Sequence, residues 1–202
     1  PPPPPLITTI MISPGQLLDV RATSPEGFRV AAAFGDTVFT HKTASQGSQP
    51  VFFKIEGDDS EIAAIALNKN SSRIIVSTQS KTLYAFDTES GSLLGSRPLN
   101  KKAAAVRCAD WGGADAPEVV LAADKTGDVV ALPLSALEQG GKKNKEQQQQ
   151  EKEKAEKKIW PPMLLGHTAS ILTDMAVSAC GRWLITADRD EKVRVSAFPT
   201  TA

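Results

Sequence analysis

The stretch GRWLITADRDEKVRVSAFP, residues 181–199, decides the fold of this chain. Two apolar runs flank the short charged segment ADRDEK, which is the pattern of two β-strands joined by a tight turn. The same succession of strand, polar turn and strand occurs three more times along the chain. These segments are FRVAAAFGDTVFTHK (28–42), SRIIVSTQSKTLYAFDTESGSLL (72–94) and PEVVLAADKTGDVVALPLSAL (117–137). The chain therefore contains an internal repeat, and the repeat indicates the architecture.

The spacing of the repeat favours a β-propeller. The equivalent positions Val30, Ile74, Val119 and Trp183 are separated by 44, 45 and 64 residues. The last interval becomes about 44 once about twenty residues of a charged insertion are removed. A period of about 40 to 45 residues, with about four strands in each unit, is typical of a WD-repeat blade. Three units show a further strand ahead of the quoted segment, predicted at Ile62–Leu67, Ala104–Asp110 and Leu172–Ser178.

We therefore expect an all-β WD-repeat β-propeller with about four blades in residues 21–202. Residues 1–20 form an N-terminal segment in which the proline run favours disorder. Seven blades of this period need about 300 residues, so the chain is expected to be the N-terminal part of a seven-bladed ring. A set of only four blades leaves sheet edges and an apolar face uncovered.

The composition excludes several classes of protein. The 202 residues include 23 basic and 23 acidic side chains, and this zero net charge argues against binding nucleic acid by bulk charge. Two cysteines, Cys108 and Cys180, without CxxC spacing indicate neither a disulfide framework nor a zinc site. No apolar run approaches about 18 residues, and the first residues lack the basic segment of a signal peptide. We expect a protein of a reducing, intracellular compartment.

Residues 138–158, EQGGKKNKEQQQQEKEKAEKK, differ from the rest of the chain in composition. They hold seven Lys and five Glu, and Ala155 is their only apolar residue. Such a segment cannot bury enough apolar surface to offset the entropy of ordering it. The favoured interpretation is a solvated loop insertion, and the alternative is a lysine-rich arm that contacts an RNA backbone.

Nothing in the sequence indicates an enzyme. The chain has two histidines and lacks GxSxG, P-loop and GxGxxG motifs, so no catalytic or metal-ligating residues are predicted. His167 follows Gly166 in LLGHT, the Gly-His dipeptide with which a WD blade begins. We expect a structural histidine, hydrogen-bonded to the turn aspartate Asp190.

The charged segment of residues 188–192 carries more charge than a tight turn needs, because one aspartate is enough to fix the turn. Turns of this kind lie at one rim of a propeller, where a rigid scaffold displays binding residues. The preceding repeat has the matching turn ADKTGDV, residues 123–129. Two neighbouring blades would thus bring four cations together, either as a solvated rim or as a docking site for a partner protein. The four are Lys125, Arg189, Lys192 and Arg194.

The segment LLGHTASILTDMAVSACGRWLITADRDEKVRVSAFP closely resembles a blade of the WD-repeat, non-catalytic subunit of eukaryotic tRNA (guanine-N7) methyltransferase. TADRDEKVRVS is its most specific part, since ordinary WD blades are closer to SGSxDxTVRVWD, with tryptophan where this chain has Ser196. The resemblance covers mainly residues 117–199 and, more weakly, 60–95. The chain departs from the pattern at Ala179–Cys180, where blades usually have Pro-Asp ahead of the glycine of the turn.

The resemblance implies a subunit that performs no chemistry and holds no cofactor, with S-adenosylmethionine bound by its partner. The partner is a Rossmann-type catalytic subunit, and the heterodimer methylates N7 of a guanine in the variable loop of tRNA. Arg194 is then the first candidate for an ion pair across the subunit interface, followed by Lys192, Arg189 and Lys125. Asp188 and Asp190 are expected to orient these cations. The implied location is the nucleus, with the cytoplasm as a second location and no contact with a membrane.

Three other functions compete with this one. A WD-repeat scaffold for another partner protein fits the fold but leaves the ADRDEK segment unexplained. RNA binding without a partner, through the lysine-rich insertion, is disfavoured by the low net charge and by the lack of interleaved aromatic residues. An autonomous enzyme ranks last, because no nucleophile–base pair or metal cluster is visible.

Overall fold

The computed structural model describes residues 17–24, 27–43, 49–111, 117–138, 165–166, 170–178 and 180–198. Antiparallel β-sheets dominate these ranges, and each sheet pairs its strands in chain order. The first sheet consists of β1 (Leu17–Ser24), β2 (Gly27–Phe34), β3 (Thr37–Lys42) and β4 (Val51–Lys54). The second consists of β5 (Ile62–Leu67), β6 (Arg73–Thr78), β7 (Thr82–Asp87) and β8 (Leu93–Pro98).

The third and fourth sheets follow the same plan. The third consists of β9 (Ala103–Asp110), β10 (Glu118–Asp124), β11 (Asp128–Pro133) and β12 (Leu165–Gly166), with the helix α1 (Leu134–Glu138) after β11. The fourth consists of β13 (Leu172–Val177), β14 (Trp183–Asp188) and β15 (Val193–Ala197). Within the described ranges, no helix has the length and apolar character needed to cross a membrane.

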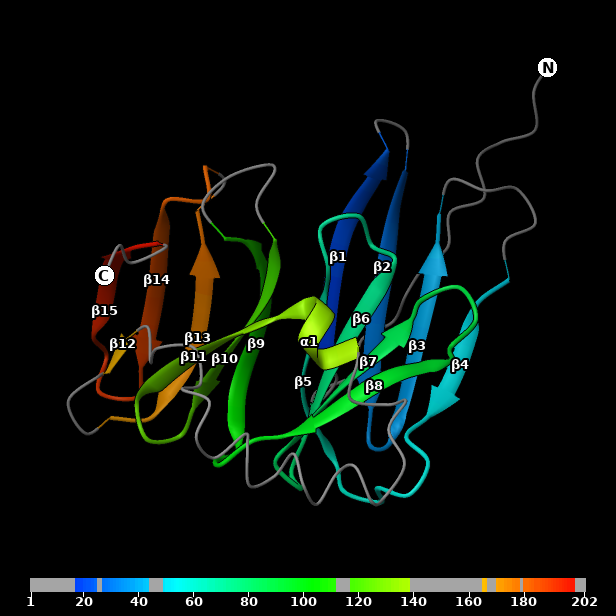
Figure 1. Ribbon diagram of the computed structural model, residues 1–202, viewed down its shortest axis with the longest axis horizontal. Coiled ribbons are helices and arrows are strands. Elements are labelled where there is room, and N and C mark those ends of the chain that lie inside the picture. Colours follow the sequence, from blue (N-terminus) through cyan, green and yellow to red (C-terminus); the bar gives the residue numbers. More distant parts are fainter. Residues whose placement is uncertain are drawn as a thin grey trace.

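The four-fold repeat predicted from the sequence is confirmed. Each quoted segment forms the second and third strands of one sheet, and the strands predicted ahead of them correspond to β5, β9 and β13. The sheets stand side by side in chain order, and β1, β5, β9 and β13 contact one another in succession (Figure 1). Successive blades meet along their first strands in this way in a β-propeller.

The first sheet begins earlier than the boundary expected at residue 21. Strand β1 starts at Leu17, which pairs with Ala33 of β2, and the pairing runs on to Ala22 opposite Phe28. The stretch that precedes it, with the proline run, lies outside the described residues.

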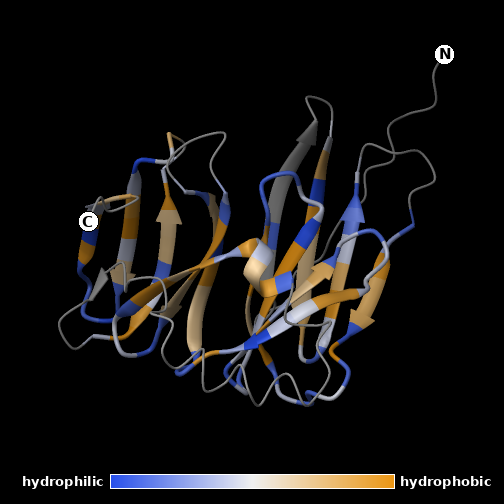
Figure 2. Ribbon diagram, in the orientation of Figure 1, coloured by the Kyte–Doolittle hydropathy of each residue, from blue (hydrophilic) through white to orange (hydrophobic). Residues whose placement is uncertain are grey.

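One hydrophobic core lies at each boundary between neighbouring sheets. Alternate residues of a strand enter different cores, because successive side chains point to opposite faces of a sheet. In β6, Ile74 and Val76 pack toward the first sheet and Ile75 packs toward the third. In β10, Val120 faces the second sheet and Leu121 the fourth. Figure 2 shows that hydrophilic residues concentrate at the turns that join these strands.

The outer faces of the two terminal sheets are exposed, unlike the buried faces of the second and third. One face of the fourth sheet packs in the core shared with the third sheet, and Leu184, which is 2% exposed, lies on this face. The opposite side of the same sheet carries Trp183, 48% exposed, and Val195, 63% exposed. On the first sheet Phe34 and Phe52 are exposed in a comparable way.

Helix α1 lies against the second sheet, although the sequence predicts β-structure throughout outside the insertion. Its Leu134 and Leu137 are buried in the core between the second and third sheets. Gly95 of β8 allows this approach, since a Cβ there would collide with the carbonyl oxygens of Leu137 and Glu138. Residues 139–164 of the expected insertion lie outside the described residues.

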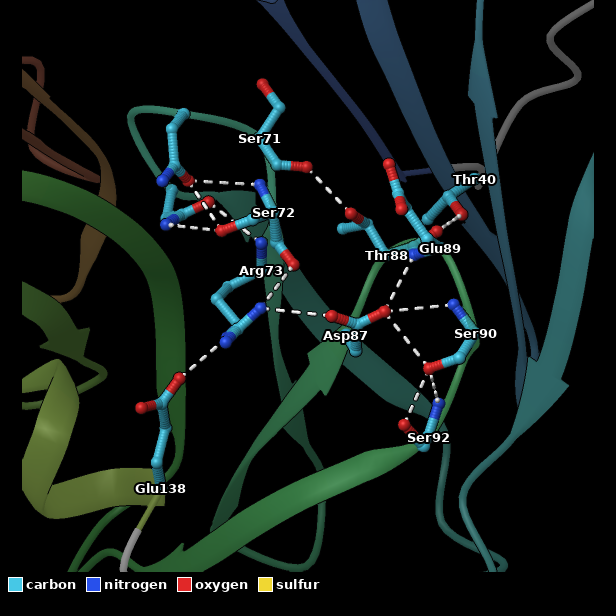
Figure 3. A network of polar contacts seen from close by, with 12 residues as sticks. Thr40, Ser71, Ser72, Arg73, Asp87, Thr88, Glu89, Ser90, Ser92 and Glu138 are labelled. Carbon is cyan, nitrogen blue, oxygen red and sulfur yellow. Dashed lines mark hydrogen bonds and ion pairs between the residues drawn. The ribbon is translucent and has the colours of Figure 1, made fainter. Parts of the chain in front are cut away.

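Glu138, placed by the sequence analysis in a solvated loop, takes part in a polar network that crosses two sheets (Figure 3). Arg73 donates to a Glu138 carboxylate oxygen at 2.7 Å and to Asp87 at 3.0 Å. The backbone carbonyl of Thr88 accepts hydrogen bonds from Thr40 of the first sheet, at 2.8 Å, and from Arg29, at 3.1 Å. The turn between β7 and β8 is thereby attached to the first sheet and, through Asp87 and Arg73, to helix α1.

A polar clasp joins the loop ahead of the second sheet to the hairpin between β6 and β7. One carboxylate oxygen of Asp58 accepts hydrogen bonds from Thr78, Ser80 and Tyr84 at 2.9, 2.6 and 2.9 Å. The other accepts from the backbone and side chain of Ser60 at 3.0 and 2.5 Å. Partial burial opposes ionisation of Asp58, but these hydrogen bonds outweigh it and hold its pKa well below the usual value. Burial and the hydrogen bond to Asp58 raise the pKa of Tyr84 to about 12.

The third sheet makes the same clasp with the opposite charge in the loop. Lys101 precedes β9 and donates to Thr126 and Asp128 in the hairpin at 2.5 and 2.9 Å. It also lies 3.6 Å from Asp124. The hydrogen bond to Asp128 and the charges of both carboxylates raise the pKa of Lys101.

We expect Gly95→Ala to destabilise the protein by about 2 kcal/mol or more, because the added methyl group forces α1 off β8. Urea unfolding of this variant is compared with that of Gly91→Ala. Gly91 lies in a turn with a φ of +70°, and its nearest contacts are side chains, so Gly91→Ala measures the cost of a strained turn without displacement of α1. Equal stability of Gly95→Ala and wild type would show that α1 is not held against β8.

We expect Asp58→Asn to lower the free energy of unfolding by about 2 kcal/mol at pH 7, because the hydrogen bonds to a charged acceptor weaken. The folded pKa of Asp58 is depressed, so its stabilising effect is complete above the unfolded pKa near 3.8 and is lost as the pH falls toward the folded value. The difference from wild type should therefore shrink below about pH 4.

Urea titrations at a series of pH values measure this difference, with the exposed neighbour Asp59→Asn as control. A difference that stays constant down to pH 2.5 or so would contradict the assignment of the acid-sensitive stability to Asp58.

Candidate partner-binding rim

The turn between β14 and β15 is built around Asp188, which is 7% exposed. Its Oδ1 accepts hydrogen bonds from the backbone N–H groups of Asp190 and Lys192 at 2.9 and 3.1 Å. The sequence analysis gave the role of turn aspartate to Asp190, whereas the described geometry shows Asp188 fixing the turn backbone. Asp190 is exposed and lies 3.7 Å from Arg189.

The matching turn of the third sheet has the same construction. Oδ1 of Asp124 accepts from the backbone N–H groups of Thr126 and Asp128 at 2.7 and 3.0 Å. Burial raises the pKa of this carboxyl, but the hydrogen bonds to Asp128 and Thr126 outweigh that effect and lower it. An aspartate, buried in the case of Asp188 and partly buried in the case of Asp124, thus holds each of these turns in one conformation, and the residue that follows it is exposed.

Three of the four predicted cations are exposed at these turns. Lys125 and Arg189 each directly follow the aspartate that fixes the turn, so they occupy equivalent positions on neighbouring sheets. The Arg189 side chain is 65% exposed, and Lys192 is exposed directly before β15. The structure therefore presents Lys125, Arg189 and Lys192 on turns of the same kind.

Arg194 has a different environment. It pairs with Thr186 of β14, which is fully buried, so its side chain points to the same side of the sheet, toward the third sheet. It is half-buried, whereas its neighbours Val193 and Val195 on the opposite side are exposed. Such a cation is more strongly desolvated than the other three, which strengthens any ion pair that it makes.

The predicted Gly-His element is described only in part. Gly166 ends β12, opposite Asp128 of β11, and His167 lies outside the described residues. The hydrogen bond between His167 and Asp190 therefore stays a prediction. Sequence reasoning missed the two clasps, although the Gly-Asp dipeptide of Gly57 and Asp58 stands where the fourth unit has Gly-His.

Other kinds of site find little support in the described part of the chain. There, no three His, Cys, Asp or Glu side chains are grouped so that they could hold a metal ion. Cys108, which is half-buried in β9, and Cys180, which is exposed in the turn between β13 and β14, are not joined in a disulfide. The hydrogen bond with Ser178 lowers the pKa of Cys180 to about 7.

Comparison with solved structures supports the propeller fold. A chain of the crystal structure of BBS1N in complex with ARL6DN aligns with a TM-score of 0.62 and 12% identity, over 92% of this chain and 52% of that one. A chain of the crystal structure of the mitotic checkpoint complex aligns with a TM-score of 0.62 and 15% identity, over 90% and 45%. At such low identity the likeness concerns the fold alone.

Sequence relatives are more specific. The non-catalytic subunit WDR4 of tRNA (guanine-N(7)-)-methyltransferase from Homo sapiens is 31% identical over 188 residues, which is 90% of this chain and 39% of the relative. The corresponding subunit of Bos taurus is 30% identical over 78% of this chain and 31% of its own length. That of Dictyostelium discoideum is 32% identical over 68% and 28%. The chain thus spans about a third of the length of the curated relatives that it matches.

A family model described as the WD40 domain of tRNA methyltransferase TRM82 matches residues 36–161 and 134–202, which together cover most of the chain. This range includes the ADKTGDV and ADRDEK turns on which the resemblance was based. The relatives are named non-catalytic subunits, in agreement with a sequence that lacks catalytic motifs. The chain belongs to the WD-repeat family of the tRNA methyltransferase TRM82.

Proposed function

We propose that this protein is the non-catalytic subunit of a tRNA (guanine-N7) methyltransferase and that it binds and stabilises a separate catalytic subunit. The pair would form N7-methylguanosine in the variable loop of tRNA. In this proposal the propeller holds no cofactor, S-adenosylmethionine binds to the catalytic subunit, and the heterodimer works in the nucleus, with the cytoplasm as a second location.

The observation that carries the proposal is the pair of rigid charged turns on a chain of this family. Asp124 and Asp188 fix the two turns through their side chains, so the cations beside them are displayed without a large loss of backbone entropy on binding. Exposed Lys125, Arg189 and Lys192 suit the guidance of an acidic partner surface toward the rim. The half-buried Arg194 suits a desolvated ion pair with a carboxylate of the partner.

We expect Arg194→Glu to weaken assembly with the catalytic subunit while the propeller stays folded. Breaking a desolvated ion pair at an interface costs about 2–5 kcal/mol, which is roughly thirty-fold to several thousand-fold in affinity. Arg182→Glu is a matched control, since it makes the same charge change at an exposed position at the opposite end of β14.

The experiment co-expresses each full-length variant with the cognate catalytic subunit and measures both co-purification and N7 methylation of tRNA. Wild type and Arg182→Glu should give a complex and an activity that requires both chains. Co-purification of Arg194→Glu at the wild-type level would contradict the role of Arg194, and failure of the wild-type pair to form a complex would contradict the proposed function.

A further inference from the structure

A pocket of about 230 Å³ opens at the rim between the second and third sheets. Its walls are mainly the apolar side chains of Leu99, Ala103, Ala122 and Val130. The charged residues of the clasp, Lys101, Asp124 and Asp128, line the rest of it. This volume is many times the roughly 10–15 Å³ that one water needs on the same measure, so the pocket has room for a side chain.

The pocket results from small residues at positions that are filled one sheet earlier. Strand pairing makes Ala122 and Val130 neighbours in the third sheet, as Val76 and Tyr84 are in the second. Likewise, Ala103 pairs with the last residue of β10 and Ile62 with the last residue of β6.

At the boundary between the first and second sheets, Ile62, Val76 and Tyr84 pack into the hydrophobic core, and the Tyr84 hydroxyl bonds to Asp58. At the next boundary the residues Ala103, Ala122 and Val130 leave that corner open.

The charges beside the pocket are unequal. Lys101 is the one cation among the lining residues, and it faces two carboxylates, at 2.9 Å from Asp128 and 3.6 Å from Asp124. The lining therefore carries one net negative charge over an apolar wall. A long aliphatic stem that ends in a cation complements both properties, because it covers apolar surface and brings its charge to the carboxylates.

We propose that this pocket receives one arginine or lysine side chain of the catalytic subunit. The inference rests on the proposed function, which supplies the partner. Lys125, one of the cations assigned to the interface, directly follows Asp124, so the pocket continues the proposed binding rim. Anchor residues buried in pockets of this kind carry much of the affinity of an interface.

Two variants test the apolar and the charged parts of the pocket separately. Val130→Tyr introduces the residue that the second sheet has at this position and fills the pocket without changing its charge. Asp128→Asn removes one negative charge and keeps the shape. Affinities of the full-length protein for the purified catalytic subunit are measured by calorimetry at low and high salt, with Asp59→Asn, on an exposed loop of the second sheet, as control.

We expect Val130→Tyr to weaken binding about thirty-fold, the loss typical of an anchor residue. Asp128→Asn should weaken it about ten-fold and reduce its dependence on salt, and Asp59→Asn should leave it unchanged. The thermal stability of each free variant is recorded alongside, so that any loss of stability from the altered clasp is separated from the loss of binding; in Asp128→Asn, Lys101 keeps Asp124 as a partner.

Several outcomes overturn the inference. If both pocket variants bind normally while Arg194→Glu does not, the proposed function stands and the pocket is not part of the interface. If only Val130→Tyr weakens binding, the occupant is an apolar side chain, and if only Asp128→Asn does, the charge acts without insertion. A loss of stability in the free variants that accounts for the loss of binding would make the pocket a structural element of this chain. Absence of a wild-type complex refutes the proposed function itself.

Discussion

The structure depends on the burial of both faces of a sheet. The strands of the second and third sheets carry apolar side chains at successive positions, such as Ile74 and Ile75, and these enter two different cores. Burial of one such side chain contributes about 1.5–3 kcal/mol, but only if another sheet covers the face on which it lies. A single sheet of this composition therefore cannot be stable alone, and each blade requires its neighbours.

This requirement explains where the polar contacts lie. Since the faces of the sheets are largely occupied by apolar packing, the polar contacts that join loops to strands lie at the two ends of the strands. At one end, Thr88 attaches the turn between β7 and β8 to the first sheet, and Arg73 links the end of β7 to helix α1. At the other, Asp58 and Lys101 attach the loop ahead of each sheet to its hairpin. The loop residue is an acceptor for three hydroxyl groups in the second sheet and a cation facing two carboxylates in the third, so the clasp depends on complementarity within a sheet and not on one residue type.

The sequence predicted the repeat, the strands and the position of the charged turns, because these follow from alternation of apolar residues and from turn composition. It did not predict α1, which is too short for a periodic pattern and depends on the space left by Gly95. It named both Asp188 and Asp190 as turn residues, but only the hydrogen-bond geometry shows that the carboxylate of Asp188 is the one that accepts from the turn backbone. The sequence did not predict the hydrogen bonds of Asp58 either, because Thr78, Ser80 and Tyr84 are distant from it along the chain.

One strand position shows how a repeated fold acquires different surfaces. Tyr84, Val130 and Arg194 each pair with the antepenultimate residue of the strand before them and face the preceding sheet. At the first boundary the tyrosine closes the corner, and at the second the valine leaves a pocket. At the third boundary, between the third and fourth sheets, the position holds Arg194, a half-buried cation. Because the flanking core residues maintain the packing of the sheets, this one position can vary without loss of the fold. The valine thus lies at the pocket between the second and third sheets, and the arginine lies at the boundary between the third and fourth. Both places are at the rim, where a partner protein can reach them.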